Sequence, residues 1–216
     1  MDSMIITRLK KQISIYLTIE QKNAKYKMGV NKSIKIKENY AYYKKLLKER
    51  KSIFSEVIEI NEVGNNHNIL EFIEHVEQNI LESKMLFVVN VKVNNYNFFQ
   101  FKLRAKEYTP CPFFRFDNDG DTHRNKVDGI TLEKNVITTP HFHKYNEKGI
   151  EIAYKTDKLL NKQEAKALED INLCIAHFFH EANIRVKQDK FPVVNILTNS
   201  LGLDFSTSDP NENMTF

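Results

Sequence analysis

The stretch from Phe113 to Tyr145 concentrates the side chains that could do chemistry. Three of the chain's seven histidines fall in it, together with four aspartates. The polar members are Arg115, Asp117, Asp119, Asp121, His123, Asn125, Asp128, His141 and His143. So many titratable groups in a short stretch mark a candidate site, although they do not name a reaction.

The spacing of His141 and His143 suggests how this site is built. On a β-strand the two rings would point to the same face, roughly 6.5–7 Å apart along the chain. Phe142 between them would face the core. Arg115 and Asp117 share a face by the same alternation. If the two strands pair, the four side chains form one polar patch, and the loop that carries His123 and Asn125 covers it.

Three interpretations of this patch stay open. In metal-free phosphodiester chemistry, one histidine takes a proton from a ribose 2′-hydroxyl, another protonates the leaving oxygen, and Arg115 holds the phosphate. In a metal site, His141 and His143 bind an ion such as zinc with either His123 or Asp117, and water fills the open position. In a structural cluster, Asp117 and Asn125 cap backbone groups and satisfy the histidines.

The composition indicates a globular domain with a real core. The chain has 216 residues, of which 41% are hydrophobic and 15 are phenylalanine. No apolar run approaches the roughly 18 residues that span a bilayer, and the first residues do not resemble a signal peptide. Two cysteines without CxxC spacing predict no disulfide framework. These features predict a cytoplasmic protein with no membrane partner.

Charge is unevenly distributed along the chain. Residues 1–51 carry 14 Lys or Arg against 4 Asp or Glu, whereas the remaining residues are net acidic. A basic segment of this kind favours contact with a polyanion, most often nucleic acid, or docking on the protein's own acidic body. Lys44, Lys45 and Lys48 fall on a predicted helix in this segment and are candidate substrate-binding residues.

Hydrophobic periodicity predicts the elements that position the site. Helices are expected over 38–54 and 68–80, with Asn68 as N-cap of the second, and over 162–183. Residues 13–19 fit either a strand or a helix, and a short alternating piece covers 33–37. Strands are expected over 85–93, 96–106, 113–117, 136–145 and 150–155. The predicted fold is an α+β domain with a mostly antiparallel five-stranded sheet, one long helix packed on it, and a helical basic N-terminal region. The expected divisions are 1–82, a core domain over 83–198, and a flexible tail over 199–216.

The spacing of the polar residues resembles a known pattern. The pattern comprises Arg115-x-Asp117-x-x-Gly120-x-x-His123-x-Asn125, then Asp128-Gly129, Pro140-His141-x-His143-x-Tyr145, and Asn183-Ile184. It is similar to that of a family of small bacterial proteins of unknown function, found in genomes rich in prophage and other mobile genetic elements. The resemblance covers about residues 85–192.

Three departures from the family pattern stand out. Asp121-Thr122 replaces two prolines before His123, Lys126-Val127 replaces a single proline, and Ala182 replaces a cysteine. The family has no known activity, so the resemblance implies a site and a mobile-element setting, not a mechanism.

The sequence leads to one functional hypothesis and one alternative. The hypothesis is a small cytosolic nuclease, directed at RNA and of a phage–host conflict or toxin type. Arg115 would bind phosphate, and His123, His141 and His143 would supply acid, base or metal ligation. Asp117 would orient a histidine, Asn125 would hold the loop, and Asn125 and Tyr145 are candidates for substrate binding. Zinc is the candidate metal. The alternative is a non-catalytic binding protein, an antitoxin or an inhibitor of a host defence complex, in which the lysines bind the partner and the histidine cluster is structural.

Overall fold

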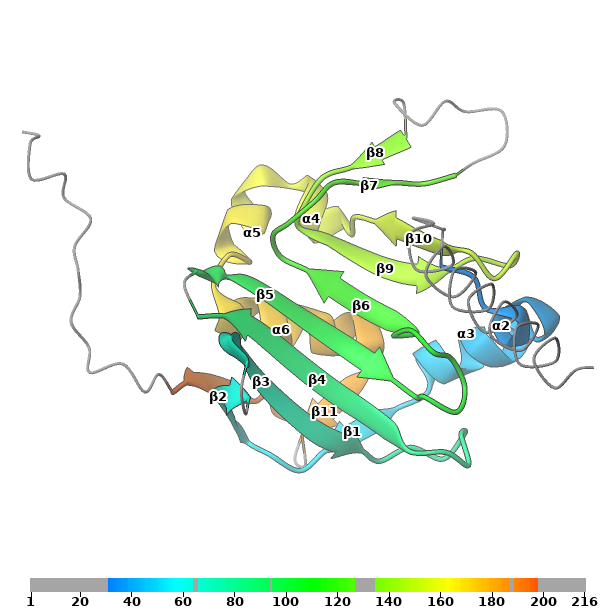
Figure 1. Cartoon of the computed structure of the whole chain (residues 1–216), viewed down its shortest axis with the longest axis horizontal. Coiled ribbons are helices and arrows are strands. Elements are labelled where there is room, and N and C mark those ends of the chain that lie inside the picture. Colours follow the sequence, from blue (N-terminus) through cyan, green and yellow to red (C-terminus); the bar gives the residue numbers. More distant parts are fainter. Residues whose placement is uncertain (1–30, 64–65, 94, 127–134, 187–188, 198–216) are drawn as a thin grey trace, which may run out of the picture. The chain divides into compact units, whose positions relative to one another are not determined.

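The computed structural model describes residues 31–63, 66–93, 95–126, 135–186 and 189–197 (Figure 1). The described residues from Ser33 onward belong to one compact unit. The expectations for residues 13–19, for most of the basic segment and for the C-terminal tail lie outside the described residues. No helix in the described ranges is long and apolar enough to cross a membrane.

A sheet of eight strands organises this unit, in the order β10-β9-β6-β5-β4-β3-β2-β12. The strands are β2 Val57–Val63, β3 Asn66–Val76, β4 Met85–Lys92, β5 Asn95–Arg104, β6 Phe114–Asp117, β9 His141–Tyr145, β10 Glu151–Tyr154 and β12 Val193–Ile196. All neighbours are antiparallel except β12, which runs parallel to β2. The α+β class is therefore confirmed, but the prediction of five strands is wrong because β2, β3 and β12 extend the sheet.

The helix predicted over 68–80 is wrong, because most of this segment is strand β3. β3 pairs with β4 along its length, from Ile69 opposite Lys92 to Val76 opposite Met85. Leu70 and Val76 are buried, while Ile73, on the opposite face, is 53% exposed. Apolar residues on both faces of a strand can reproduce the spacing of a helix by coincidence. Pairing with β4 is what makes this segment a strand. The expected division at residue 82 falls between these two paired strands.

Two helices, not one long helix, occupy the segment 162–183. They are α5 Lys162–Ala167 and α6 Ile171–Ala182. Asp170 starts α6 as its N-cap, since its side chain accepts hydrogen bonds from the backbone of Asn172 and Leu173. α6 packs on the sheet through Phe178, whose ring lies 5.4 Å from that of Phe101 and 5.5 Å from that of Phe114, centroid to centroid.

The segment before the sheet also differs from its prediction. The alternating piece over 33–37 lies largely in helix α2 Ile34–Glu38, and the helix expected over 38–54 is α3 Tyr40–Lys48. Asn39 separates the two and caps α3. β1 Lys51–Ile53 then pairs in parallel with β11 Ile184–Val186, and α4 Asp157–Leu160 precedes α5.

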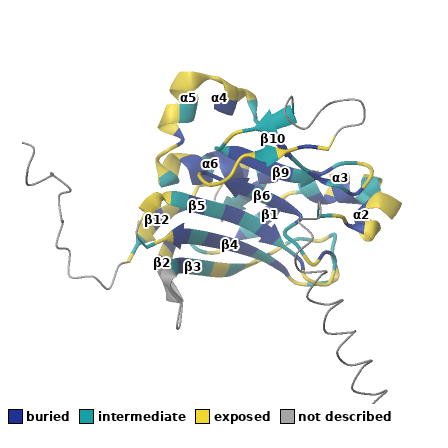
Figure 2. Ribbon diagram, turned by 45° about the horizontal axis from the view of Figure 1, so that its top comes forward, coloured by how far each residue is buried: buried dark blue, intermediate teal, exposed yellow. Residues whose placement is uncertain are grey.

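The two faces of the sheet have different characters. The face under α6 is an aromatic core that includes Phe87, Phe101, Phe116 and Phe142. Figure 2 shows β4, β6 and β9, which carry three of these rings, largely buried. Because side chains alternate along a strand, the polar residues of β5, β6 and β9 lie on the opposite face. A separate two-stranded sheet, β7 His123–Arg124 with β8 Val136–Ile137, comes from the loop between β6 and β9 (Figure 1).

Candidate functional site

Strands β6 and β9, which are direct neighbours, bring four polar side chains together on the open face of the sheet, the face opposite α6. In the pairing of the two strands, Arg115 lies opposite His143 and Asp117 lies opposite His141. Directly opposed residues of an antiparallel pair share a face. Phe142 is fully buried on the other face, as its place between the two histidines predicted. Strand alternation in the sequence therefore predicted this juxtaposition.

The Nε2 atom of His143 is the meeting point of the cluster. It lies 2.7 Å from His141 Nε2, 3.0 Å from Arg115 Nη2 and 3.0 Å from Asp117 Oδ2. Arg115 Nε in turn lies 3.1 Å from Asp117 Oδ2. A single imidazole nitrogen either donates one hydrogen or offers one lone pair, so it cannot satisfy three polar neighbours at once.

Three of these residues form a group that could hold a metal ion. Each of Asp117, His141 and His143 offers one ligand atom, and these atoms lie within 4.8 Å of one another in a buried setting. His123 is not part of this group: its ring centroid is 5.0 Å from that of His143 and 6.4 Å from that of His141. Of the two candidate third ligands, the structure brings Asp117 into the group and leaves His123 beside it.

Burial and charge set the protonation of the cluster. Burial lowers the pKa of His141 to about 4, and the neighbouring His143 acts in the same direction. Burial also lowers the pKa of His123. For Asp117, burial by itself would raise the pKa, but the hydrogen bond from His143 and the charge of Arg115 outweigh it and lower the pKa. At neutral pH the site thus holds a carboxylate and at least two neutral imidazoles.

A cleft of about 450 Å³ gives access to the cluster. Arg115, Asp117, His141 and His143 form its floor, and the residues from Asp119 to His123 line it from the loop after β6. Gly120 brings this loop close to β5. Its φ is +121°, and a Cβ atom built there would lie 3.3 Å from Phe98 Cε2.

Two functional candidates were missed by sequence reasoning. Glu151 on β10 is buried, and its Oε1 lies 3.7 Å from both Arg115 Nη2 and His143 Nδ1. Lys102 on β5 lies opposite Arg115, and burial lowers its pKa. Both belong to strands that were predicted, but their place beside the site depends on the order of strands in the sheet.

Asn125 holds the loop and does not face the cleft. Its amide Nδ2 donates to the carbonyl of Ala153 at 2.7 Å, and its Oδ1 accepts from the backbone N–H of Ala153 at 2.8 Å. This side chain therefore pairs with β10 as another strand would. Tyr145 is also buried: its ring packs edge-on against Tyr43, with centroids 6.1 Å apart. Neither residue lines the cleft, which argues against their predicted substrate-binding roles.

The three lysines proposed for substrate binding lie apart from the cleft. Lys44, Lys45 and Lys48 are exposed on α3 and do not line it. α3 instead contacts the sheet through Tyr43, whose hydroxyl donates to the carbonyl of Phe113 at 2.8 Å.

Comparisons with known proteins add no relative. No family model matches the chain, and no curated protein or solved structure matches it. The resemblance to the mobile-element family stays a prediction, and any function must be argued from the site itself.

Proposed function

We propose that this protein is a metal-dependent phosphodiesterase that cleaves RNA. The observation that supports it best is the convergence of Asp117, His141 and Arg115 on His143 Nε2, at the floor of an open cleft. A histidine pair, a carboxylate and a guanidinium are the groups that bind a divalent ion and a phosphate side by side.

The ligand distances are compatible with a metal ion. Two ligands about 2.0–2.1 Å from a tetrahedral zinc stand roughly 3.3 Å apart. The three separations in the cluster, 2.7, 3.0 and 3.9 Å, bracket that value. Asp117, His141 and His143 would hold such an ion, which would satisfy both Nε2 lone pairs and the carboxylate at once. The cluster without an ion leaves His143 Nε2 with more neighbours than it can bond.

Arg115 then becomes available to substrate. A ring nitrogen that binds a metal cannot also accept a hydrogen bond, so with a metal bound the guanidinium of Arg115 would not be bonded to His143 Nε2. Asp117 and Glu151 still hold it at the cleft, at 3.1 and 3.7 Å. A planar guanidinium in this position can bind a phosphate through two parallel hydrogen bonds.

His123 is placed to act as the base. It is half-buried at the cleft, outside the metal group. It takes the proton of the ribose 2′-hydroxyl, whose oxygen attacks phosphorus while the bond from phosphorus to the 5′-oxygen breaks. The departing 5′-oxygen takes a proton from water, and the resulting hydroxide recovers the proton from His123, so the products are a 2′,3′-cyclic phosphate and a 5′-hydroxyl. The bound ion would supply Lewis-acid stabilisation of the phosphoryl oxygens.

The test is cleavage of a labelled RNA oligonucleotide and of the DNA of the same sequence. We expect the RNA alone to be cut, the cutting to stop with a chelator, and zinc or manganese to restore it. His141→Ala and His143→Ala should each abolish cleavage and remove the metal from the purified protein, with the circular dichroism spectrum unchanged.

His75→Ala is the matched control, because His75 is exposed on β3 and does not line the cleft. It should leave cleavage and metal content unchanged. Less than a tenth of an equivalent of any transition metal, or full activity in His143→Ala, would overturn the proposal. A protein with no turnover that loses a partner when Lys44, Lys45 and Lys48 are neutralised would support the binding-protein alternative instead.

A further inference from the structure

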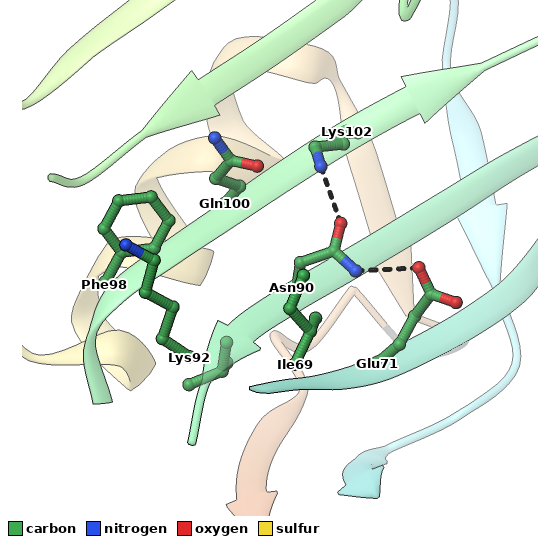
Figure 3. Close-up of a pocket in the computed structure, with 8 residues that line it drawn as sticks. Ile69, Glu71, Asn90, Lys92, Phe98, Gln100 and Lys102 are labelled. Carbon is green, nitrogen blue, oxygen red and sulfur yellow. Dashed lines mark hydrogen bonds between the residues drawn. The ribbon is translucent and has the colours of Figure 1, made fainter. Parts of the chain in front are cut away.

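A second hollow adjoins the cleft on the open face of the sheet. It has a volume of about 230 Å³ and lies over β3, β4 and β5. Lys92, Phe98 and Gln100 line both hollows, so the two are neighbours that share these side chains. Figure 3 shows the second hollow with Ile69 and Glu71 on the side away from Phe98.

A chain of hydrogen bonds fixes the polar groups of this hollow. Lys102 Nζ donates to Asn90 Oδ1 at 2.6 Å, and Asn90 Nδ2 donates to Glu71 Oε2 at 2.7 Å (Figure 3). The Asn90 amide therefore has one orientation. Asn90 has a second N–H to donate and Glu71 has further lone pairs to accept, and both residues line the hollow.

The walls and the size of the hollow suit a flat ring. Ile69 and Phe98 give it two apolar sides, and the ammonium of Lys92 lies 3.7 Å from the centroid of the Phe98 ring. Its volume is below the roughly 300–1,000 Å³ of pockets that hold drug-sized ligands, which limits the occupant to one small group.

We propose that this hollow binds the nucleobase next to the phosphate held at the cleft, a proposal that rests on the proposed function. Every base presents a donor and an acceptor side by side on its pairing edge, which matches the pair offered by Asn90 and Glu71. β4 lies two strands from β6, about 9.5 Å at the usual strand spacing, so a single nucleotide spans the two hollows.

Lys102 links the two hollows. It donates to Asn90 in the second hollow and lies opposite Arg115 in the first. A base that engages Asn90 therefore contacts a residue hydrogen-bonded to Lys102, which is paired with the phosphate-binding Arg115 across β5 and β6. This arrangement favours a substrate with a base and a phosphate in fixed relation, which is a nucleotide.

Binding of nucleotides by the wild-type chain tests this inference without any cleavage. The probes are the four ribonucleoside 5′-monophosphates, which contain no phosphodiester bond, and ribose 5-phosphate as a control that lacks a base. At least one monophosphate should bind about tenfold more tightly than ribose 5-phosphate by isothermal titration calorimetry, the ratio that one good hydrogen-bonding contact gives. Asn90→Ala and the isosteric Glu71→Gln should each remove most of that preference.

Gln163→Ala, an exposed amide on α5, is the control and should change nothing. Equal binding of ribose 5-phosphate and all four nucleotides, or a preference that survives both variants, would overturn the inference. The two proposals fail separately. Nucleotide binding without RNA cleavage removes the phosphodiesterase alone, and RNA cleavage unaffected by Asn90→Ala removes the base site alone.

Discussion

At the scale of single residues, Arg115 has the least replaceable position. Its guanidinium contacts Asp117, His143 and Glu151, which lie on three different strands. A guanidinium reaches several acceptors in one plane, whereas a lysine ammonium is a single point charge. The planar shape of the side chain at this position therefore matters more for these contacts than its charge alone.

Arg115→Lys keeps the charge and removes the planar fork. We expect kcat/KM for RNA cleavage to fall about 100-fold, the usual effect of losing one oriented donor to a developing negative charge. The metal content should not change, because Arg115 is not a ligand. Steady-state kinetics with Arg124→Lys, an exposed arginine on β7, as control would check this. Unchanged kcat/KM would remove Arg115 from the mechanism.

At the scale of secondary-structure elements, the loop between β6 and β9 is tied to the sheet edge by Asn125. Both of its hydrogen bonds go to Ala153 on β10, at 2.7 and 2.8 Å. The backbone of Asn125 is held in turn by Asn135, whose carbonyl accepts from the Asn125 N–H at 3.1 Å. The position of His123, two residues earlier, depends on this attachment.

Asn125→Asp tests this attachment while leaving the side-chain size unchanged. The carboxylate can still accept from Ala153 N–H but cannot donate, so the Ala153 carbonyl loses its partner inside the protein. We expect the free energy of unfolding to fall by about 1–3 kcal/mol, measured by urea denaturation. RNA cleavage should fall as well, because His123 loses its support.

Asn97→Ala, an exposed asparagine on β5, is the matched substitution. It should leave both stability and cleavage near wild type. A variant Asn125→Asp that is as stable as Asn97→Ala would show that the loop is held by other contacts.

The elements also explain what the sequence could and could not predict. Alternation in β4, β5, β6 and β9 is strong, so these strands and the shared face of Arg115, Asp117, His141 and His143 were predictable. β3 was misassigned because apolar residues occupy both of its faces. Glu151 and Lys102 escaped notice because only the strand order, set by long-range pairing, brings β10 and β5 beside the site.

At the scale of the whole molecule, Lys51 joins segments that are far apart in sequence. Its side chain is fully buried, and its ammonium donates to the carbonyls of Leu47, Glu49 and Ala182 at 3.1, 2.7 and 2.8 Å. It thereby caps the C-terminal ends of both α3 and α6. Burial lowers the pKa of this ammonium from 10.5 to about 8.

The lowered pKa of Lys51 predicts that stability increases with pH. Below pH 8 both the folded and the unfolded chain hold the proton, and the folded state bears the full cost of burying the charge. Between pH 8 and 10.5 the unfolded chain still holds the proton while the folded chain has lost it, so the free energy of unfolding rises. From pH 7 to 9.5 this contribution amounts to about 2 kcal/mol.

Urea denaturation of the wild type and of Lys51→Met at pH 7, 8.5 and 9.5 isolates the contribution of Lys51 to the free energy of unfolding, since all other groups titrate alike in both proteins. Lys51→Met should be less stable throughout, because three carbonyls lose their donor. The difference between the free energies of unfolding of the two proteins should widen as the pH rises. Lys51→Arg keeps its charge across this range and should follow Lys51→Met in its pH dependence. A constant gap would mean that Lys51 has the same pKa in the folded and unfolded chains, and that its three hydrogen bonds fully offset the burial of its charge.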